Sequence, residues 1–362
     1  MIVIAKIGTS SVTASDGSVD TEAVGKLCAE VAGLRGDGHT VVVVTSGAVT
    51  AGVAAVAPLG EYPTDPMTLQ ALSAIGQPRL MRVYEDALAS HGLLAGQVLL
   101  APLDFAHRQR YLHARATFTR LLELGVVPIV NENDAIADDE IRFGDNDRLA
   151  ALVAHLLRAD VLVLLTDTAG LLSADPRHSA EATLIEEVTE IDRELEDLAG
   201  GAASWMSRGG MSSKLAAAKM AVWSGSQVVI AAARRPGVLA DAVAGTPGVG
   251  TIFLPQRRAL GARKLWIAFA LRPAGRIVVD DGARRAVVER GKSLLPAGVT
   301  AVEGDFEADD AVEIVSSDRM MFAKGIARLG SSRAKEWVGL RTAELAEDLP
   351  HEVVHRDDLV VL

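Results

Sequence analysis

The sequence is poor in cysteine and in aromatic residues, and each shortage excludes a class of protein. Its 362 residues include a single cysteine, Cys28, so no intramolecular disulfide can form and a small disulfide-held secreted fold is excluded. Aromatic residues make up 4% of the chain, against 49% hydrophobic and 23% charged residues. This aliphatic composition indicates a globular protein with a sizeable core. Cys28 lies in a helical pattern and is expected to pack as a small hydrophobic residue in a reducing compartment.

Long apolar runs are also missing, and we expect no export leader. The longest apolar runs, such as 41–44 and 161–165, are far shorter than the roughly 20 residues that span a bilayer. Met1 is followed directly by the strand-like run 2–7, without a basic segment or a cleavage site. The formal net charge of −11 gives no general attraction to nucleic acid or to anionic membranes. We therefore expect a soluble, cytoplasmic protein whose partners must be argued from local sites.

Two sequence patterns divide the chain. In residues 1–258, short β-branched runs alternate with longer helical segments rich in Ala and Leu, which is the rhythm of βαβ units. The expected strands are apolar on both faces, so we predict an α/β fold: an αβα sandwich with a mainly parallel sheet covered by helices on each side. After Gly261, short predicted strands, the first of them at 264–271, follow one another closely between acidic or glycine turns, and these predict a small C-terminal β-barrel.

The length of the chain exceeds the usual size of one hydrophobic core, which favours a large domain and a smaller one. We place the first domain at 1–258, a linker at 259–272, the second domain at 273–351 and a C-terminal tail at 352–362.

A lysine ends the apolar first strand, and Gly8 with two hydroxyl residues follows it. Ligands of open α/β sheets bind beyond the carboxyl ends of the strands, so Lys6 is expected to point into that crevice, although a lysine can also simply snorkel from a strand end. Ser46 and Gly47 follow the second strand in the same way. Ser46 can cap the next helix, and free backbone N–H groups there can hold a substrate carboxylate; the two roles can coexist.

Two clusters rich in Asn and Asp come next, one at 131–134 after a strand and the other at 144–148 before a helix. Turn chemistry explains either cluster when it is taken alone. Together they suit recognition of an amino acid, because carboxylates hold an ammonium group and amides donate to a carboxylate. The candidate residues are Asn131, Asp134, Asn146 and Asp147.

A glycine pair, Gly209 and Gly210, opens a helix with Lys214 one turn inside it. Glycines allow the backbone to approach phosphate oxygens closely, and the helix N-terminus adds donors and a positive dipole end. The spacing matches neither a Walker A loop nor a Rossmann fingerprint, and a plain glycine turn is the alternative. Thr166 and Asp167 end another strand and face the same crevice, with capping as their alternative role.

Each motif is a weak signal alone, but all of them are expected at one rim of the sheet. Bringing a carboxylate to the γ-phosphate of ATP sets anions against each other, so catalysis would depend on positioning and positive charge. Lys6, Lys214 and Mg²⁺ would supply that charge.

In their order along the chain, these motifs resemble the glutamate 5-kinase family of the amino acid kinase superfamily. The matching segments are KIGTSS, VVVVTSGAVTAG, IVNENDAI, IRFGDNDRLAALVA, LLTDTAGLLSADPR and GGMSSKLAAAK. The resemblance runs from residue 2 to about 260, and the segment from about 275 to 350 looks like the PUA domain that many bacterial members carry. It implies an ATP- and Mg²⁺-dependent kinase that converts L-glutamate to L-glutamyl 5-phosphate, the first step of proline biosynthesis.

The resemblance also implies residue roles. Lys6 and Lys214 would contact ATP phosphates, and Asp147 would orient the two lysines. Glutamate would be held by Ser46, Gly47, Asp134 and Asn146, with Asn131 supporting that loop. The ATP-binding residues would be Lys6, Gly8, Thr166, Asp167, Arg208, Gly209, Gly210, Met211, Ser212, Ser213 and Lys214, and no protein metal site is implied.

The same resemblance implies inhibition by proline, transfer of a labile product to glutamyl phosphate reductase, and assembly into dimers or tetramers. The chain departs from the family pattern at Ser207 and Arg208, where Gly-Thr is usual, so the phosphate loop can be held differently. A second departure, at 327–329, leaves any specialised role of the PUA-like segment less secure.

Two alternatives stay open. Another kinase of the superfamily could act on acetylglutamate, aspartate, carbamate or a nucleoside monophosphate such as UMP, although the PUA-like segment argues for glutamate. A different class is an RNA-binding protein acting through that segment. Residues 273–362 contain 12 Lys or Arg and 17 Asp or Glu, and the resulting charge of −5 has the wrong sign for a phosphate-binding surface.

Overall fold

The computed structural model describes residues 1–56, 63–101, 104–105, 107–136, 146–174, 181–199, 210–256, 260–271, 273–345 and 351–362. The chain forms two compact units, Met1–Ala259 and Leu260–Leu362. Each unit has its own sheet and its own core.

The first unit is built on an eight-stranded sheet with the order β3-β4-β2-β1-β5-β7-β8-β6. The strands are β1 (Ile2–Ile7), β2 (Thr40–Val44), β3 (Ala95–Leu100), β4 (Val127–Glu132), β5 (Val161–Thr166), β6 (Glu187–Val188), β7 (Gln227–Ala232) and β8 (Gly250–Phe253). Neighbouring strands are parallel except β7 and β8, which are antiparallel. Strands β4 and β5 are buried along their whole length, which explains their unbroken apolar runs and confirms the predicted mainly parallel α/β sheet.

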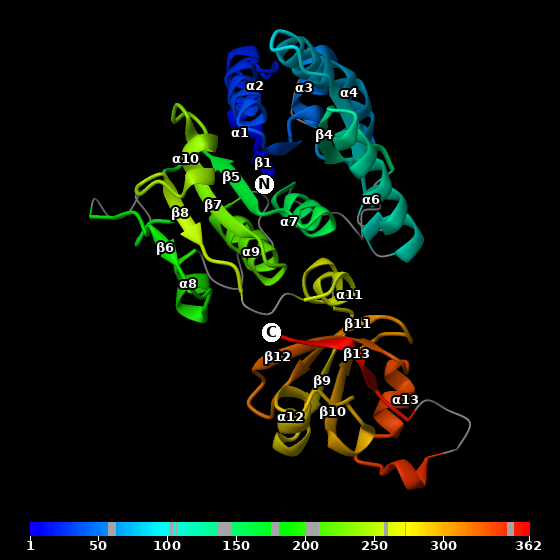
Figure 1. The fold of residues 1–362 in the computed structure, drawn as a ribbon. Helices are drawn as coiled ribbons and strands as arrows, with labels where there is room; N and C mark the ends of the chain where they lie inside the picture. The colour runs from blue at the N-terminus through cyan, green and yellow to red at the C-terminus, as the bar shows by residue number, and fades with distance from the viewer. Residues whose placement is uncertain are drawn as a thin grey trace. The chain divides into compact units, whose positions relative to one another are not determined.

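Helices cover both faces of this sheet (Figure 1). They are α1 (Thr9–Val12), α2 (Thr21–Gly36), α3 (Ala48–Val56), α4 (Pro66–Ala89), α6 (Arg108–Glu123), α7 (Asn146–Leu157), α8 (Arg193–Leu198), α9 (Met211–Trp223) and α10 (Val238–Ala244), with the 3-10 turn η1 (Asp134–Ile136). Helices α2, α4 and α10 share a core with Val3 and Ala5 of β1. Helices α6, α7 and α9 contact the strands from the other face, because successive strand residues point to opposite sides.

Two glycines allow α3 and α4 to pack unusually closely. A Cβ atom at Gly52 would lie 1.9 Å from the carbonyl oxygen of Leu72, and one at Gly76 would lie 1.8 Å from that of Ala48. No side chain fits at either position without moving a helix backbone. The N-terminus of α4 is capped by Asp65, whose carboxylate accepts from the Thr68 N–H at 2.9 Å. This packing fixes where the middle of α4 lies along the first unit.

The second unit contains a five-stranded sheet with the order β10-β9-β11-β12-β13. Its elements are β9 (Gly275–Val279), α12 (Asp281–Val288), η3 (Pro296–Gly298), β10 (Val299–Gly304), β11 (Ala311–Val315), β12 (Met321–Ala327), α13 (Ser331–Glu336), η4 (Thr342–Glu344) and β13 (Val354–Val361). Strands β9 and β11 are parallel, and the other neighbouring pairs are antiparallel.

The start and end of this unit differ from expectation. The run 264–271, predicted as a strand, forms α11 (Ala262–Leu265) and the π-helix η2 (Trp266–Ala270), because a short continuous apolar run does not distinguish a strand from a buried helix. Leu265 and Ile267 are fully buried and the segment contacts β12 and β13, so residues expected to be a linker belong to the second unit. The expected C-terminal tail carries β13, which pairs with β12.

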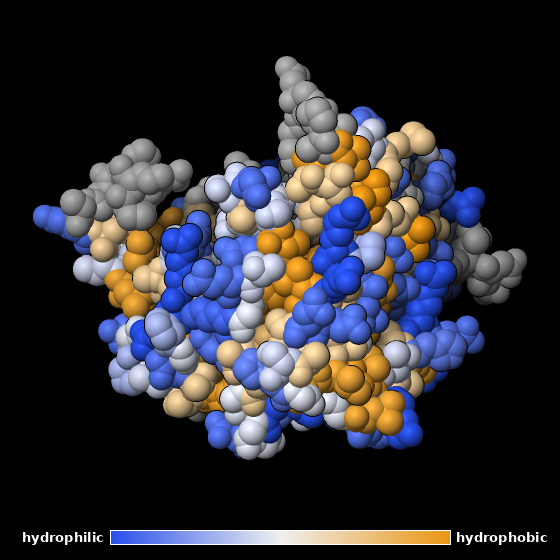
Figure 2. Space-filling view, turned by 90° about the horizontal axis from the view of Figure 1, so that it is seen from above, coloured by the Kyte–Doolittle hydropathy of each residue, from blue (hydrophilic) through white to orange (hydrophobic). Residues whose placement is uncertain are grey.

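The surface carries apolar residues in separate groups. Figure 2 shows orange groups interrupted by hydrophilic residues in blue. Among the large apolar side chains of the first unit, Met67 is 80% exposed, Ile136 72% and Leu94 68%. Such scattered exposure is normal for a folded protein. Within the described residues, no helix has both the length and the apolar character needed to cross a membrane.

Candidate active site

A cavity of about 500 Å³ lies at the carboxyl ends of the central strands of the first unit. Lys6 pairs with Val44 and Ile7 pairs with Leu165, so β1, β2 and β5 end at the same edge of the sheet. This is where an open α/β sheet binds its ligand. The structure brings these predicted site residues to the cavity wall: Lys6, Gly8, Ser46, Gly47, Asn131, Asp134, Asn146, Thr166, Asp167 and Lys214.

Two lysines line one end of the cavity, and a buried aspartate contacts both of them. Lys6 comes from the end of β1, Lys214 from the first turn of α9, and Asp147 from the first turn of α7. The Lys6 Nζ lies 2.5 Å from Asp147 Oδ1, and the Lys214 Nζ lies 3.0 Å from Asp147 Oδ2. We call these three residues the lysine end. One carboxylate thus contacts two ammonium groups.

All three side chains are almost completely buried, with exposures of 2% for Lys6, 5% for Lys214 and 0% for Asp147. Burial raises the pKa of Asp147, but the charges of Lys6 and Lys214 and their hydrogen bonds outweigh it, so that pKa lies below its usual value. The aspartate therefore stays ionised at neutral pH. A buried ion cluster of this kind keeps its charges only because each is paired.

The start of α9 supports this arrangement. Ser213 Oγ donates to the carbonyl oxygen of Gly210 at 2.9 Å, and it lies 3.3 Å from Asp147 Oδ2. Gly210 has the extended conformation of an N-cap residue, and α9 begins at Met211. The backbone N–H groups of its first turn, from Met211 to Ser213, therefore lie at this edge of the sheet. Arg208, Gly209, Ser207 and the segment 144–145 lie outside the described residues.

Hydrogen bonds between amides and hydroxyls organise the middle of the cavity. The Asn146 Nδ2 group contacts the carbonyl oxygen of Thr45 at 2.6 Å, Asn131 Oδ1 at 2.7 Å and Ser46 Oγ at 3.0 Å. Asn131 Oδ1 also accepts from the N–H of Glu132 at 2.9 Å. Asn146 thereby connects the ends of β2 and β4 to the start of α7.

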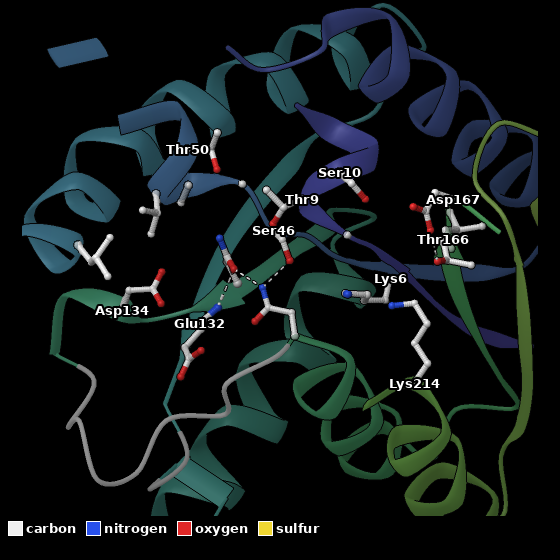
Figure 3. Close-up of a pocket in the computed structure, with 18 of the residues that line it drawn as sticks. Lys6, Thr9, Ser10, Ser46, Thr50, Glu132, Asp134, Thr166, Asp167 and Lys214 are labelled. Atoms are coloured by element: carbon white, nitrogen blue, oxygen red, sulfur yellow. Dashed lines mark hydrogen bonds between the residues drawn. The ribbon is translucent and has the colours of Figure 1, made fainter. Parts of the chain in front are cut away.

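Two carboxylates lie on the far side of this network. Asp134, in η1, and Glu132, at the end of β4, both line the cavity. Figure 3 shows them on the side opposite Lys6 and Lys214, with Ser46 between. Ser73 Oγ, from α4, donates to Asp134 Oδ2 at 2.7 Å. We call Asp134 and Glu132 the acid end. The cavity is therefore polarised, with cations at one end and anions at the other.

Three further predicted residues shape the rim. Thr166 Oγ1 donates to Asp167 Oδ1 at 3.1 Å where β5 ends. Gly47 has a φ of +99°, which side chains rarely tolerate, and a Cβ there would lie 3.2 Å from a methyl group of Val12. The turn after β2 therefore requires glycine, and its backbone stays accessible from the cavity.

The family of the chain follows from comparison with known proteins. The model of the amino acid kinase family matches residues 1–232. The chain belongs to the amino acid kinase family. The PUA domain model matches residues 275–349 of this amino acid kinase.

Relatives of this amino acid kinase match it along nearly the whole length. The glutamate 5-kinase of Pelobacter propionicus is 45% identical, over 99% of this chain and 97% of its own. Those of Geobacter sulfurreducens and Moorella thermoacetica are 44% and 46% identical, again over 99% of this chain and over 97% and 96% of their own. Isopentenyl phosphate kinase of T. acidophilum, a solved structure, is 18% identical, covers 70% of this chain and all of its own, and has a TM-score of 0.48. The resemblance drawn from the sequence motifs is confirmed.

Sequence reasoning missed several residues of the cavity wall, among them Thr9, Ser10, Thr50, Gln70 and Glu132 as a site residue. Thr9 and Ser10 directly follow Gly8 and could have been included with that motif. Gln70 could not, because it lies in the middle of α4 and no motif surrounds it.

Proposed function

We propose that this amino acid kinase transfers the γ-phosphoryl group of ATP to the side-chain carboxylate of L-glutamate. The observation that carries the proposal is the polarity of the cavity, with Lys6 and Lys214 at one end and Asp134 and Glu132 at the other. The names of the relatives, which are glutamate 5-kinases at 44–46% identity, support the same activity.

The acid end provides two carboxylates that can bind the ammonium group of an amino acid. Glutamate carries one ammonium and two carboxylates, and an ammonium at Asp134 and Glu132 would direct the side-chain carboxylate toward the lysine end. The Ser46 hydroxyl, the backbone at Gly47 and the Asn146 amide lie between the two ends and are suited to hold carboxylate oxygens. An N-acylated amino acid would have no positive charge to place at the acid end, because its nitrogen is a neutral amide.

The lysine end provides positive charge for the transfer of the phosphoryl group. A glutamate side chain, with an ordinary pKa of about 4.3, is already ionised at neutral pH, so no general base is required. A carboxylate oxygen forms a bond to the γ-phosphorus while the bond from that phosphorus to the β,γ-bridging oxygen breaks, and ADP leaves. Lys6 and Lys214 would stabilise charge on the transferring group, and Asp147 would fix the positions of both ammonium groups.

The described residues fit ATP and its magnesium ion. Thr166, Asp167 and the start of α9 would line the nucleotide side, with Lys214 on the phosphates. The described residues contain no group of three His, Cys, Asp or Glu that could hold a metal, so Mg²⁺ would be bound chiefly by phosphate oxygens and water. Its chemistry is to neutralise phosphate charge.

Further parts of the proposal concern regulation and partners. Proline would inhibit by competing at the acid end, because it also carries an ammonium and a carboxylate. The acyl phosphate product is labile, which favours direct transfer to a glutamyl phosphate reductase. We also propose a cytoplasmic homo-oligomer, a dimer or tetramer; sedimentation of the purified protein with and without glutamate would test the assembly.

The test is ATP turnover by the purified protein with Mg²⁺ and hydroxylamine, which traps acyl phosphates as hydroxamates. L-glutamate, N-acetylglutamate, L-aspartate and UMP are compared as acceptors, with a Lys6→Ala protein purified in parallel as the control for contaminating kinases. We expect turnover with glutamate alone, suppressed by proline. Turnover with another acceptor would show that the acid end binds a different substrate. An equal rate in the Lys6→Ala control would show that the turnover does not come from this site.

A further inference from the structure

We propose that Ser73 of α4 is a positioning residue for the substrate, acting through the carboxylate of Asp134. Its hydroxyl donates to Asp134 Oδ2 at 2.7 Å, a distance typical of a hydroxyl hydrogen bond. This inference rests on the proposed function, because it assigns Ser73 to the end of the cavity that holds the acceptor.

Ser73 does not need to touch the substrate to have this effect. It is 1% exposed, whereas Asp134 lines the cavity. A carboxylate at the start of a short 3-10 turn can rotate about two side-chain bonds, and a buried donor on one oxygen restricts that rotation. The hydrogen bond therefore favours one orientation of Asp134 before an ammonium group arrives.

The position of Ser73 is itself fixed by tight packing. Three residues further along α4, Gly76 lies against the backbone of Ala48 so closely that no Cβ fits between them. One turn earlier, Gln70 of α4 lines the cavity. Because Gly76 fixes this part of α4, and α4 also contacts η1, the Ser73 hydroxyl is held close to Asp134.

A second hydroxyl of α4, that of Tyr84, contacts the other wall of the cavity. Tyr84, which is fully buried, shares a 2.8 Å hydrogen bond with Thr45 Oγ1, and the carbonyl oxygen of Thr45 accepts from Asn146. We call the part of the cavity formed by Ser46, Asn131, Glu132, Asp134 and Asn146 the acceptor half. Helix α4 thus contacts both the β4 side and the β2 side of the acceptor half. One helix, α4, therefore supplies a hydroxyl group to each of the two walls.

The first test replaces Ser73 by alanine and compares kinetic constants for the two substrates. We expect Ser73→Ala to raise KM for glutamate about 3- to 10-fold, the range of one hydrogen bond, with kcat and KM for ATP changed less than twofold. Ser73→Cys keeps the size but has a weaker donor, and we expect an intermediate rise. An unchanged glutamate KM in Ser73→Ala would overturn the proposal.

A double-mutant cycle separates positioning from general damage. In an Asp134→Ala background, Ser73→Ala should have no further effect on glutamate KM, because its partner is absent. The same 3- to 10-fold rise in that background would contradict action through Asp134. Ser226→Ala is the matched control, since Ser226 is also 1% exposed and its hydroxyl bonds the carbonyl oxygen of Ala159. It should lower stability without changing glutamate KM.

Failure of the proposed function gives a different result from failure of this inference. If the wild-type protein uses another acceptor, the proposed substrate is wrong, and the cycle is repeated with that acceptor. Coupling between Ser73 and Asp134 would then still support the positioning role, and additive effects would still overturn it.

Discussion

The lysine end and the acceptor half of the cavity are built in different ways. At the lysine end, charged side chains from β1, α7 and α9 contact one another directly, and all are buried. In the acceptor half, amides, hydroxyls and carboxylates from β2, β4, α4 and α7 form a hydrogen-bonded network. Two consecutive residues of α7 serve both: Asn146 contacts Ser46, and Asp147 contacts the lysines.

This difference indicates how one cavity can separate catalysis from recognition of the acceptor substrate. Ion pairs hold the two ammonium groups in place before reaction, so they can stabilise developing phosphoryl charge without first rearranging. Hydrogen-bonded polar groups instead discriminate by the partners that a ligand satisfies or leaves unpaired. We therefore expect changes at the lysine end to lower kcat, and changes in the acceptor half to raise KM for the acceptor.

The largest effect is expected for Lys214→Ala. Removing one of the two cations should lower kcat about 10²- to 10³-fold while changing glutamate KM less than about threefold. Lys219→Ala is the matched control on the same helix, because Lys219 pairs with Glu196 away from the cavity. Turnover in Lys214→Ala equal to that of the control would refute the assigned role.

The next effect concerns stability. Asp147→Asn removes the buried anion that both Lys6 and Lys214 contact, and we expect a loss of about 3–5 kcal/mol in the free energy of unfolding at pH 7. Because the pKa of Asp147 is lowered in the folded protein, its contribution is present at neutral pH and is lost as pH falls through the folded value. The difference between variant and wild type should therefore shrink in acid.

Urea unfolding at several pH values measures this difference. Asp241→Asn is the control, since Asp241 pairs with Arg235 on the surface, where both side chains are about one-third exposed. Its effect should stay below about 1 kcal/mol. An equal loss in both variants would contradict the view that the lysine end depends on buried pairing.

A smaller effect is expected from His155, which lies on the same helix, α7, that joins the two ends. Burial, and then the charges of Arg158 and Arg115, lower its pKa to about 4. The unfolded chain takes up this proton near pH 6.5, so the folded protein should lose about 1–3 kcal/mol as pH falls from 6.5 to 4. His155→Gln should flatten the dependence of the free energy of unfolding on pH between 6.5 and 4, as measured by urea titrations. A dependence identical to that of wild type would contradict this role of His155.

The smallest effect is expected for Glu132→Gln, which removes one charge from the acid end while keeping shape. Glutamate KM should rise about 3- to 10-fold with little change in kcat, because the ammonium keeps Asp134. Glu123→Gln on the exposed end of α6 is the control. A fall in kcat with constant KM would assign Glu132 to the reaction rather than to selection.

The sequence predicted the site where residues follow strands. Lys6, Asn131 and Thr166 could be grouped because the carboxyl ends of parallel strands share one edge. Ser73 and Gln70 could not, since their contribution depends on how closely α3 and α4 pack at Gly52 and Gly76. The run 264–271 was likewise unpredictable, because a short continuous apolar run lacks the periodicity that separates a strand from a helix.

The central claim is that the acid end orients the acceptor so that its side-chain carboxylate faces the lysines. The most direct measurement is the identity of the hydroxamate formed from ATP, L-glutamate and hydroxylamine, resolved by chromatography against the two authentic isomers. The account predicts the γ-glutamyl hydroxamate. The α-isomer would show that glutamate binds in the opposite direction and would contradict the account.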